Sequence, residues 1–128
     1  MSLDTYALHA YAVEVQGLPL RDEIKALLND ADDKDGGKYQ DIDDVLEDFR
    51  EGCLEEPVWT ELDKHHWEMF YGPCNDVYIG YSAQMPYELP FFTKDEMDKD
   101  IYDTLTYLCG EEYAKKNTPD EIYETWTE

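Results

Sequence analysis

Residues 93–110 have the sequence TKDEMDKDIYDTLTYLCG, which contains a helix signal from start to stop. Thr93 and Glu96, three residues apart, predict a capping box at the first turn. Four apolar residues recur at helical spacing and give the helix an inner face: Met97, Ile101, Leu105 and Leu108. Gly110 stands where a glycine commonly follows a helix. A second cap signature, with Pro at the first helical position, predicts a terminal helix over residues 118–126.

Three more helices are predicted nearer the N-terminus. Residues 20–28 place their apolar side chains on one face of a short helix. Residues 41–52 predict an amphipathic helix in which Asp41 is the N-cap and Gly52 ends the helix. Residues 56–72 predict a third helix, opened by a Glu-Pro pair and stopped by a Gly-Pro pair.

Strands are predicted where β-forming residues gather, and the first such segment, residues 6–15, contains neither glycine nor proline. Residues 6–15 (YALHAYAVEV) and 77–83 (VYIGYSA) fit strands, and residues 87–92 are extended. Pro90 suits an edge or a connection rather than a central strand. The sequence therefore predicts a single α+β domain over residues 1–128, mostly helical, with a small two- or three-stranded sheet.

Acidic residues dominate the charge of this chain. Thirty-two Asp and Glu residues stand against ten Lys and Arg, so the formal net charge is −22. Fourteen of the acids lie in residues 30–63 and twelve in residues 88–128. Self-repulsion of this size opposes folding and needs a reason, which is either a strongly basic partner, favoured by the sequence, or solubility and salt tolerance without any partner. With 42% hydrophobic and 14% aromatic residues, we expect a folded protein with an acidic surface, not a disordered chain.

The predicted helix over residues 41–52 gathers this charge on one solvent face. Opposite the apolar stripe lie five carboxylates: Asp43, Asp44, Glu47, Asp48 and Glu51. They span about 12 Å along the axis, which is comparable with the phosphates of one DNA strand at about 3.4 Å each. A less regular display is predicted on the helix at residues 93–110, where Asp95, Glu96, Asp98 and Asp103 are the expected contacts and Asp100 completes the display. We expect these nine carboxylates to contact a partner.

Aromatic residues gather in the nearly neutral segment between the two acidic blocks. In the strand at residues 77–83, alternation turns Tyr78 away from the face that bears Val77, Ile79 and Tyr81. Tyrosine is a favoured interface anchor. We therefore expect Tyr78 to be exposed and to join the carboxylates at the partner-binding surface.

Motifs for catalysis and metal binding do not appear in the sequence. An EF-hand alignment of the loop at residues 30–41 fails, because it places Ala31 and Ile42 at the two end ligand positions. His65 and His66 are adjacent and lack metal-ligand spacing. Nucleophile-elbow, phosphate-loop and dinucleotide-binding motifs are likewise missing. We expect no enzymatic activity, no cofactor and no bound metal.

Cysteine usage and hydropathy indicate where the protein acts. Three cysteines, an odd number without close pairing, fit reduced thiols better than a disulfide framework. No apolar run approaches the roughly 20 residues that span a bilayer. The N-terminus lacks the basic and apolar regions of a secretory signal. We expect a cytoplasmic protein that contacts neither a membrane nor nucleic acid directly.

Residues 87–91, Tyr-Glu-Leu-Pro-Phe, look like a stretch found in ArdA-type antirestriction proteins. In size, acidity and tyrosine content the chain also resembles the small DNA-mimic inhibitors of phages and mobile elements. Such proteins block restriction enzymes, CRISPR nucleases or DNA-binding proteins. The specific match covers five residues, and ArdA-type chains are longer, so no functional residue is carried over.

The leading hypothesis is an inhibitor that presents carboxylates in place of phosphates to a basic nucleic-acid-binding protein. The sequence is also compatible with a homodimer. One alternative is an immunity protein or antitoxin that neutralises a basic nuclease toxin through an aromatic hot spot. Another is a small enzyme or metal-binding domain built around His65, His66 and the loop at residues 30–41.

Overall fold

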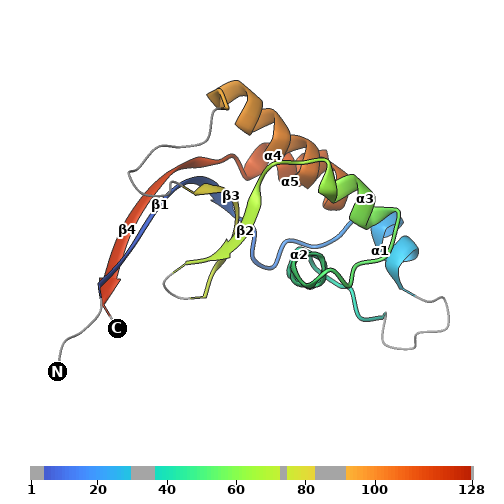
Figure 1. The fold of residues 1–128 in the computed structure, drawn as a ribbon. Coiled ribbons are helices and arrows are strands. Elements are labelled where there is room, and N and C mark those ends of the chain that lie inside the picture. Colours follow the sequence, from blue (N-terminus) through green and yellow to red (C-terminus); the bar gives the residue numbers. More distant parts are fainter. Residues whose placement is uncertain (1–4, 30–36, 73–74, 83–91, 128) are drawn as a thin grey trace.

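The computed structural model describes residues 5–29, 37–72, 75–82 and 92–127, and these residues form an α+β fold (Figure 1). The elements in chain order are β1 (Thr5–Glu14), α1 (Asp22–Leu28), α2 (Ile42–Glu51), α3 (Val58–Asp63), β2 (Glu68–Tyr71), β3 (Val77–Ser82), α4 (Lys94–Leu108), α5 (Glu111–Lys116) and β4 (Asp120–Thr127). The predicted fold class is confirmed, although the described residues form a sheet of four strands, not two or three. None of the helices in these residues is both long and apolar enough to cross a membrane.

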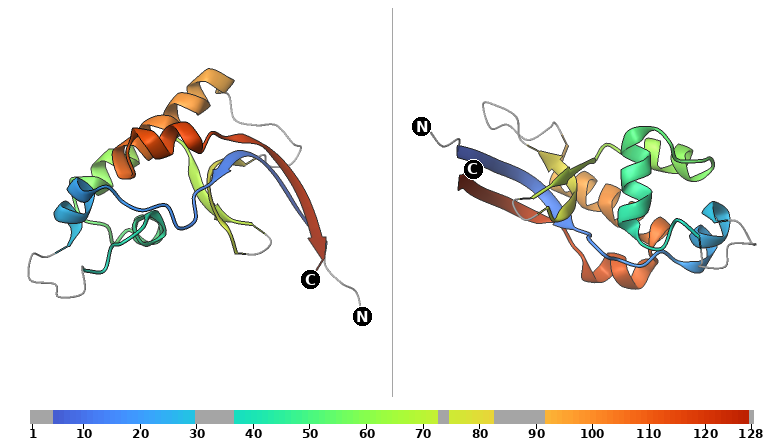
Figure 2. Two further views of the ribbon diagram at one scale, coloured as in Figure 1. Left: turned by 180° about the vertical axis from the view of Figure 1, so that it is seen from behind. Right: turned by 90° about the horizontal axis from the view of Figure 1, so that it is seen from below.

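The sheet is antiparallel throughout, in the order β2-β3-β1-β4. The register between β1 and β3 sets Tyr11 opposite Tyr81 and Val13 opposite Ile79. β4 pairs with β1 along the whole of its length. Figures 1 and 2 show β1 and β4 as a curved ribbon that reaches away from the helices, with both termini near its far end. The predicted strands at residues 6–15 and 77–83 are thus confirmed.

The two faces of the sheet differ in what they pack against. Tyr11, Val13, Ile79 and Tyr81 belong to the main core, which they share with the helices. Fully buried aliphatic residues on the helices fill that core, among them Ile42, Leu46, Ile101 and Leu105. Each such side chain contributes about 1.5–3 kcal/mol on burial. The opposite face has a small separate cluster around Tyr78, as expected from strand alternation.

The helices α2 and α4 begin and end as the sequence predicts. Asp41 and Thr93 each form a capping box, in which the cap side chain accepts a backbone N–H at the third helical residue. Gly52 follows α2 with φ of 75°, a left-handed conformation that costs glycine little. These local signals were sufficient to predict the helix ends, because each capping interaction involves only four or five consecutive residues.

The predicted helix over residues 56–72 is wrong beyond Asp63, where α3 ends. Glu68–Tyr71 instead forms β2, which pairs with β3 across a turn closed by a bond from the Gly72 N–H to the Asp76 carbonyl at 2.8 Å. Aromatic residues suit a pleated surface, and pairing with β3 gives this segment a hydrogen-bonded partner. Pairing with β3 therefore decides the structure of Glu68–Tyr71, although the spacing of its apolar residues fits a helix.

The predicted terminal helix over residues 118–126 is also wrong, because this segment is the strand β4. Its aromatic and β-branched residues suit a strand, and Asp120–Thr127 pairs with residues 5–12 of β1. Pro119 follows the helix α5, which the sequence analysis did not predict, and does not open a new one. Of the extended segment predicted at residues 87–92, only Phe92 lies within the described residues.

Candidate acidic interaction surface

The outer side of α2 displays carboxylates on three successive turns. Glu47 and Glu51 are exposed, and Asp43 lies one turn before them on the same side of the helix. Asp43 is partly buried and accepts the backbone N–H of Gly17 at 3.2 Å. Asp44 completes the capping box and accepts the backbone N–H of Gln40 at 3.0 Å. The two residues at the helix start therefore order local backbone, whereas Glu47 and Glu51 face solvent.

The display continues past the end of α2, where Glu55 and Glu56 are exposed. We call the following set the acidic α2 surface: Asp43, Asp44, Glu47, Glu51, Glu55 and Glu56. Residues 41–63 hold ten acids and one base, a net charge of −9. That one base, Arg50, lies over the Tyr71 ring at 5.7 Å from its centroid. Among the described basic side chains, none forms an ion pair with Glu47, Glu51, Glu55 or Glu56.

The carboxylates at the start of α2 repel one another. Partial burial raises the pKa of Asp43, and the negative charges of Asp41, Asp44 and Glu47 raise it further. The hydrogen bond from Gly17 opposes this change but does not cancel it. Negative charge on this surface is therefore unfavourable in the free protein, and a cation placed against it would relieve the repulsion.

Asp48 does not belong to this surface, so the prediction of five carboxylates on one solvent face is wrong for this residue. Its side chain is buried, with Lys38 Nζ at 2.7 Å and the Tyr39 hydroxyl at 2.5 Å. The bonds from Lys38 and Tyr39 lower the pKa of Asp48 in spite of its burial. Helical spacing alone could not reveal this, because both partners come from the preceding loop. Asp48 attaches residues 38–39 to α2.

The acidic residues predicted to form one display on α4 make different interactions in the structure. Asp95 and Glu96 are exposed in the first turn, where Glu96 accepts the backbone N–H of Thr93 at 3.2 Å. Asp103 pairs with Lys99 at 2.6 Å. Residues 94–116 hold seven acids and four bases, a net charge of only −3. Figure 1 shows α2 end-on where α4 is seen lengthwise, so the two displays lie on crossing helices.

Asp98 faces the sheet, in contrast to the prediction that it contacts a partner. It accepts a hydrogen bond from the Tyr11 hydroxyl, and two residues further along α4 Asp100 accepts one from the Tyr81 hydroxyl. Since Tyr11 and Tyr81 are direct neighbours across β1 and β3, the two bonds attach α4 to the centre of the sheet. Burial together with these bonds raises the pKa of both tyrosines.

Asp100 has a role that the sequence analysis missed. Besides Tyr81, it contacts His65 Nδ1 at 2.5 Å and accepts the backbone N–H of His66 at 2.9 Å. Burial raises the pKa of Asp100, but the bonds from His65, Tyr81 and His66 outweigh burial and hold it below the ordinary value. Asp100 thus joins α4 to the segment before β2. No local pattern marks this residue, because all its partners are distant in sequence.

Tyr78 points away from Val77, Ile79 and Tyr81 as predicted, but the expectation that it is exposed is wrong. Its ring is buried and stacks on Phe70, with centroids 5.6 Å apart and an interplanar angle of 7°. The large aromatic side chains exposed in the described residues are Tyr71 at 41% and Tyr123 at 64%. Tyr71 adjoins the acidic α2 surface through its contact with Arg50.

The two adjacent histidines have separate surroundings. His65 pairs with Asp100, whereas the His66 ring stacks on Phe92 with centroids 5.0 Å apart. Within residues 5–29, 37–72, 75–82 and 92–127, no group of three or more His, Cys, Asp or Glu side chains is arranged to hold a metal ion. Residues 30–36 of the loop considered for calcium lie outside the described residues.

The acidic α2 surface thus combines unneutralised carboxylates with one exposed aromatic ring. Such a surface can attract and hold cations. No family model matches this chain, and no curated protein or solved structure matches it either.

Proposed function

We propose that the protein binds the nucleic-acid-binding surface of a basic protein through the acidic α2 surface and keeps nucleic acid from it. The observation that supports this most strongly is the net charge of −9 over residues 41–63, whose only base is turned toward Tyr71. Elsewhere on the molecule, lysines offset part of the acidity, as in the pairs that Lys115 and Lys116 form with Glu111 and Glu112. Among the described basic side chains, none compensates Glu47, Glu51, Glu55 or Glu56, although Asp48 and Glu61 nearby pair with Lys38 and Lys64.

The spacing of the carboxylates suits a site built for phosphates. Asp43, Glu47 and Glu51 lie on successive turns, about 6 Å apart along the axis. Phosphates of one DNA strand are about 3.4 Å apart along the axis, so this row resembles every second phosphate. A groove lined with Lys and Arg would pair with several of these carboxylates at once.

The mechanism follows from the charge. The field of the acidic α2 surface attracts a cationic partner over about one Debye length, roughly 8 Å at physiological ionic strength. After docking, cations from the partner relieve the repulsion around Asp43. Tyr71 then supplies an aromatic contact at the margin of the charged area, a residue type favoured at interface hot spots. Association is therefore fast and sensitive to salt.

The exposure of Tyr71 supports one rival within the same interaction class, an immunity protein that neutralises a basic nuclease toxin. In that case a specific aromatic contact dominates the affinity, and the carboxylates mainly accelerate association. Replacing Tyr71 by Ala would then cost more affinity than removing two carboxylates. The leading proposal expects the reverse order.

The test begins with isolation of the partner on immobilised protein, followed by purification of that partner. Its binding to a labelled duplex DNA or RNA is then measured in competition with the wild-type protein and two double variants. Glu47→Gln/Glu51→Gln removes two charges from the acidic α2 surface. Glu111→Gln/Glu112→Gln removes two ion-paired charges from α5 and is the matched control.

We expect the wild type and the α5 control to displace the nucleic acid equally well. The α2 variant should compete about tenfold less strongly, since each interfacial charge pair contributes about 0.2–1 kcal/mol or somewhat more. A partner that binds nucleic acid and this protein simultaneously would refute the proposal. Equal losses in the two variants would assign the effect to total charge and not to α2.

A further inference from the structure

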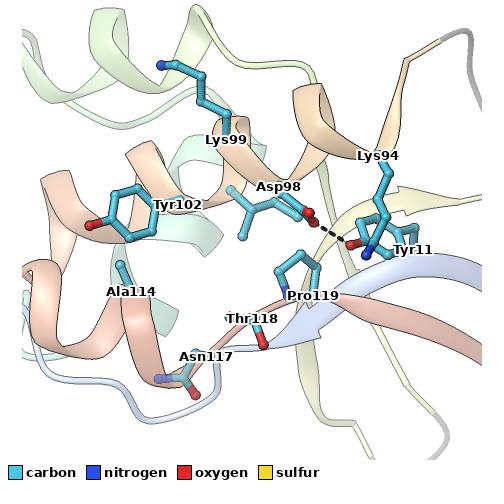
Figure 3. A pocket seen from close by; sticks show the side chains of 10 residues that line it. Tyr11, Lys94, Asp98, Lys99, Tyr102, Ala114, Asn117, Thr118 and Pro119 are labelled. Atoms are coloured by element: carbon cyan, nitrogen blue, oxygen red, sulfur yellow. Dashed lines mark hydrogen bonds between the residues drawn. The ribbon is translucent and has the colours of Figure 1, made fainter.

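A cavity of about 490 Å³ opens between α4, the end of α5 and β1 (Figure 3). Its size lies within the range of about 300–1,000 Å³ that is common for small-molecule sites. It shares no residue with the acidic α2 surface. This inference goes beyond the proposed function and does not depend on it.

The middle of the cavity is apolar. The rings of Tyr102 and Pro119 are partly exposed in it, and Ile101 of α4 and Ala114 of α5, which are almost fully buried, lie in its wall. The Tyr102 hydroxyl is directed away, since it donates to Glu111 at 3.1 Å. A hydrocarbon or aromatic group placed here would leave water for an apolar environment, which is favourable.

One end of the cavity carries two opposite charges. Figure 3 shows Lys94 and Asp98, one turn apart on α4, both reaching toward Tyr11. One oxygen of the Asp98 carboxylate accepts the Tyr11 hydroxyl, which fixes the orientation of the carboxylate. Lys94 forms no ion pair with any residue that the structure describes. The second Asp98 oxygen and the Lys94 ammonium are thus an acceptor and a donor for a ligand.

The other end of the cavity is polar but uncharged. Asn117 donates its side-chain N–H to the Tyr113 carbonyl at 2.8 Å, which leaves its amide oxygen to accept a hydrogen bond. Thr118 is exposed beside it and adds a hydroxyl. This end tolerates either an apolar group or one with a single hydroxyl.

We propose that this cavity binds a small zwitterion with an apolar body, which is the chemistry of a free hydrophobic α-amino acid. The ligand carboxylate pairs with Lys94, its ammonium group pairs with Asp98, and its side chain lies against the rings of Tyr102 and Pro119, close to Ile101 and Ala114. A ligand without net charge also avoids the repulsion that an anion would experience from a chain of net charge −22.

The test uses L-phenylalanine and records the methyl resonances of Ile101 and Ala114 by NMR. A ligand of this size, at about 0.3 kcal/mol per atom, should bind with a dissociation constant of about 1 mM. Two analogues test the contribution of each charged group: 3-phenylpropionate lacks the amino group, and 2-phenylethylamine lacks the carboxylate. Each should bind about tenfold more weakly, because each loses one charge-assisted hydrogen bond.

A charge-removing variant locates the site. Lys94→Met, an exposed substitution, should weaken L-phenylalanine binding about tenfold and abolish the preference over 2-phenylethylamine. Lys25→Met on α1 is the matched control and should change nothing. The proposal fails if the two methyl groups do not respond at about 20 mM L-phenylalanine, twenty times the expected constant. It also fails if both analogues bind as well as the amino acid.

Discussion

Removing the charge of Glu47 should stabilise the free protein. Asp43 lies four residues before Glu47 and Glu51 four residues after it, so this carboxylate takes part in two like-charge pairs on one helix face. The basic residue on the same helix does not compensate, because Arg50 lies over Tyr71. If the acidic α2 surface exists for a partner, its charges should be unfavourable when no partner is present.

The magnitude follows from the helix geometry. Each like-charge pair at i,i+4 costs about 0.2–0.5 kcal/mol, so Glu47→Gln should raise the free energy of unfolding by about 0.5–1 kcal/mol. For a chain of this size, that corresponds to a rise in melting temperature of about 2–4 °C. At about 1 M salt the Debye length falls to roughly 3 Å, and most of the gain should disappear.

Thermal unfolding followed by circular dichroism, at low and at high salt, measures this effect. Glu112→Gln is the matched control, because Glu112 is an exposed helical glutamate with Lys116 at 3.1 Å. The control should leave stability unchanged or lower it slightly. A melting temperature that falls in Glu47→Gln, or that rises equally at both salt concentrations, would refute the reasoning.

Three further predictions concern the core and its polar attachments. Asp100→Asn should lower the free energy of unfolding by about 2 kcal/mol at neutral pH, measured in urea. Because folding lowers the pKa of Asp100, the variant should show the full loss of unfolding free energy above about pH 4, and this loss should vanish at lower pH. A loss that persists in acid would contradict the role given to the Asp100 carboxylate. Burial raises the pKa of Cys109 to about 12, so iodoacetamide at mildly alkaline pH should label exposed Cys53 and leave Cys109 unmodified, as peptide mapping would show. Gly80→Ala should lower the free energy of unfolding by about 3 kcal/mol, since the new Cβ would lie 2.4 Å from neighbouring β1 atoms. Gly52→Ala, which has open space around it and a φ of +75°, should lower it by about 1 kcal/mol in denaturant unfolding. Equal losses in the two variants would contradict this packing.

Local signals in the sequence predicted the parts of the fold that depend on local interactions. The capping boxes at Asp41 and Thr93 and the glycine after α2 placed both long helices correctly. The two errors occurred at Glu68–Tyr71 and Asp120–Thr127, where strand pairing with distant residues decides the structure. Apolar spacing in such short segments fits a helix and a strand alike.

The predicted exposure of site residues was correct where it follows from helix periodicity alone. Glu47 and Glu51 are exposed as expected. Asp48, Asp98 and Tyr78 are engaged inside the molecule, by a loop, by the sheet and by a neighbouring ring respectively. A charge on the polar side of a helix is exposed only when no other element packs against it, and one sequence does not show where other elements lie.

The most direct test of the central claim is the rate of association with the purified partner as a function of salt. Stopped-flow measurements from about 50 mM to about 500 mM salt would compare the wild type with Glu47→Gln/Glu51→Gln. We predict that the wild-type rate falls steeply with salt and that the α2 variant associates more slowly at low salt, with a shallower dependence. Rates that are independent of salt and identical in the two proteins would show that the acidic α2 surface does not guide binding.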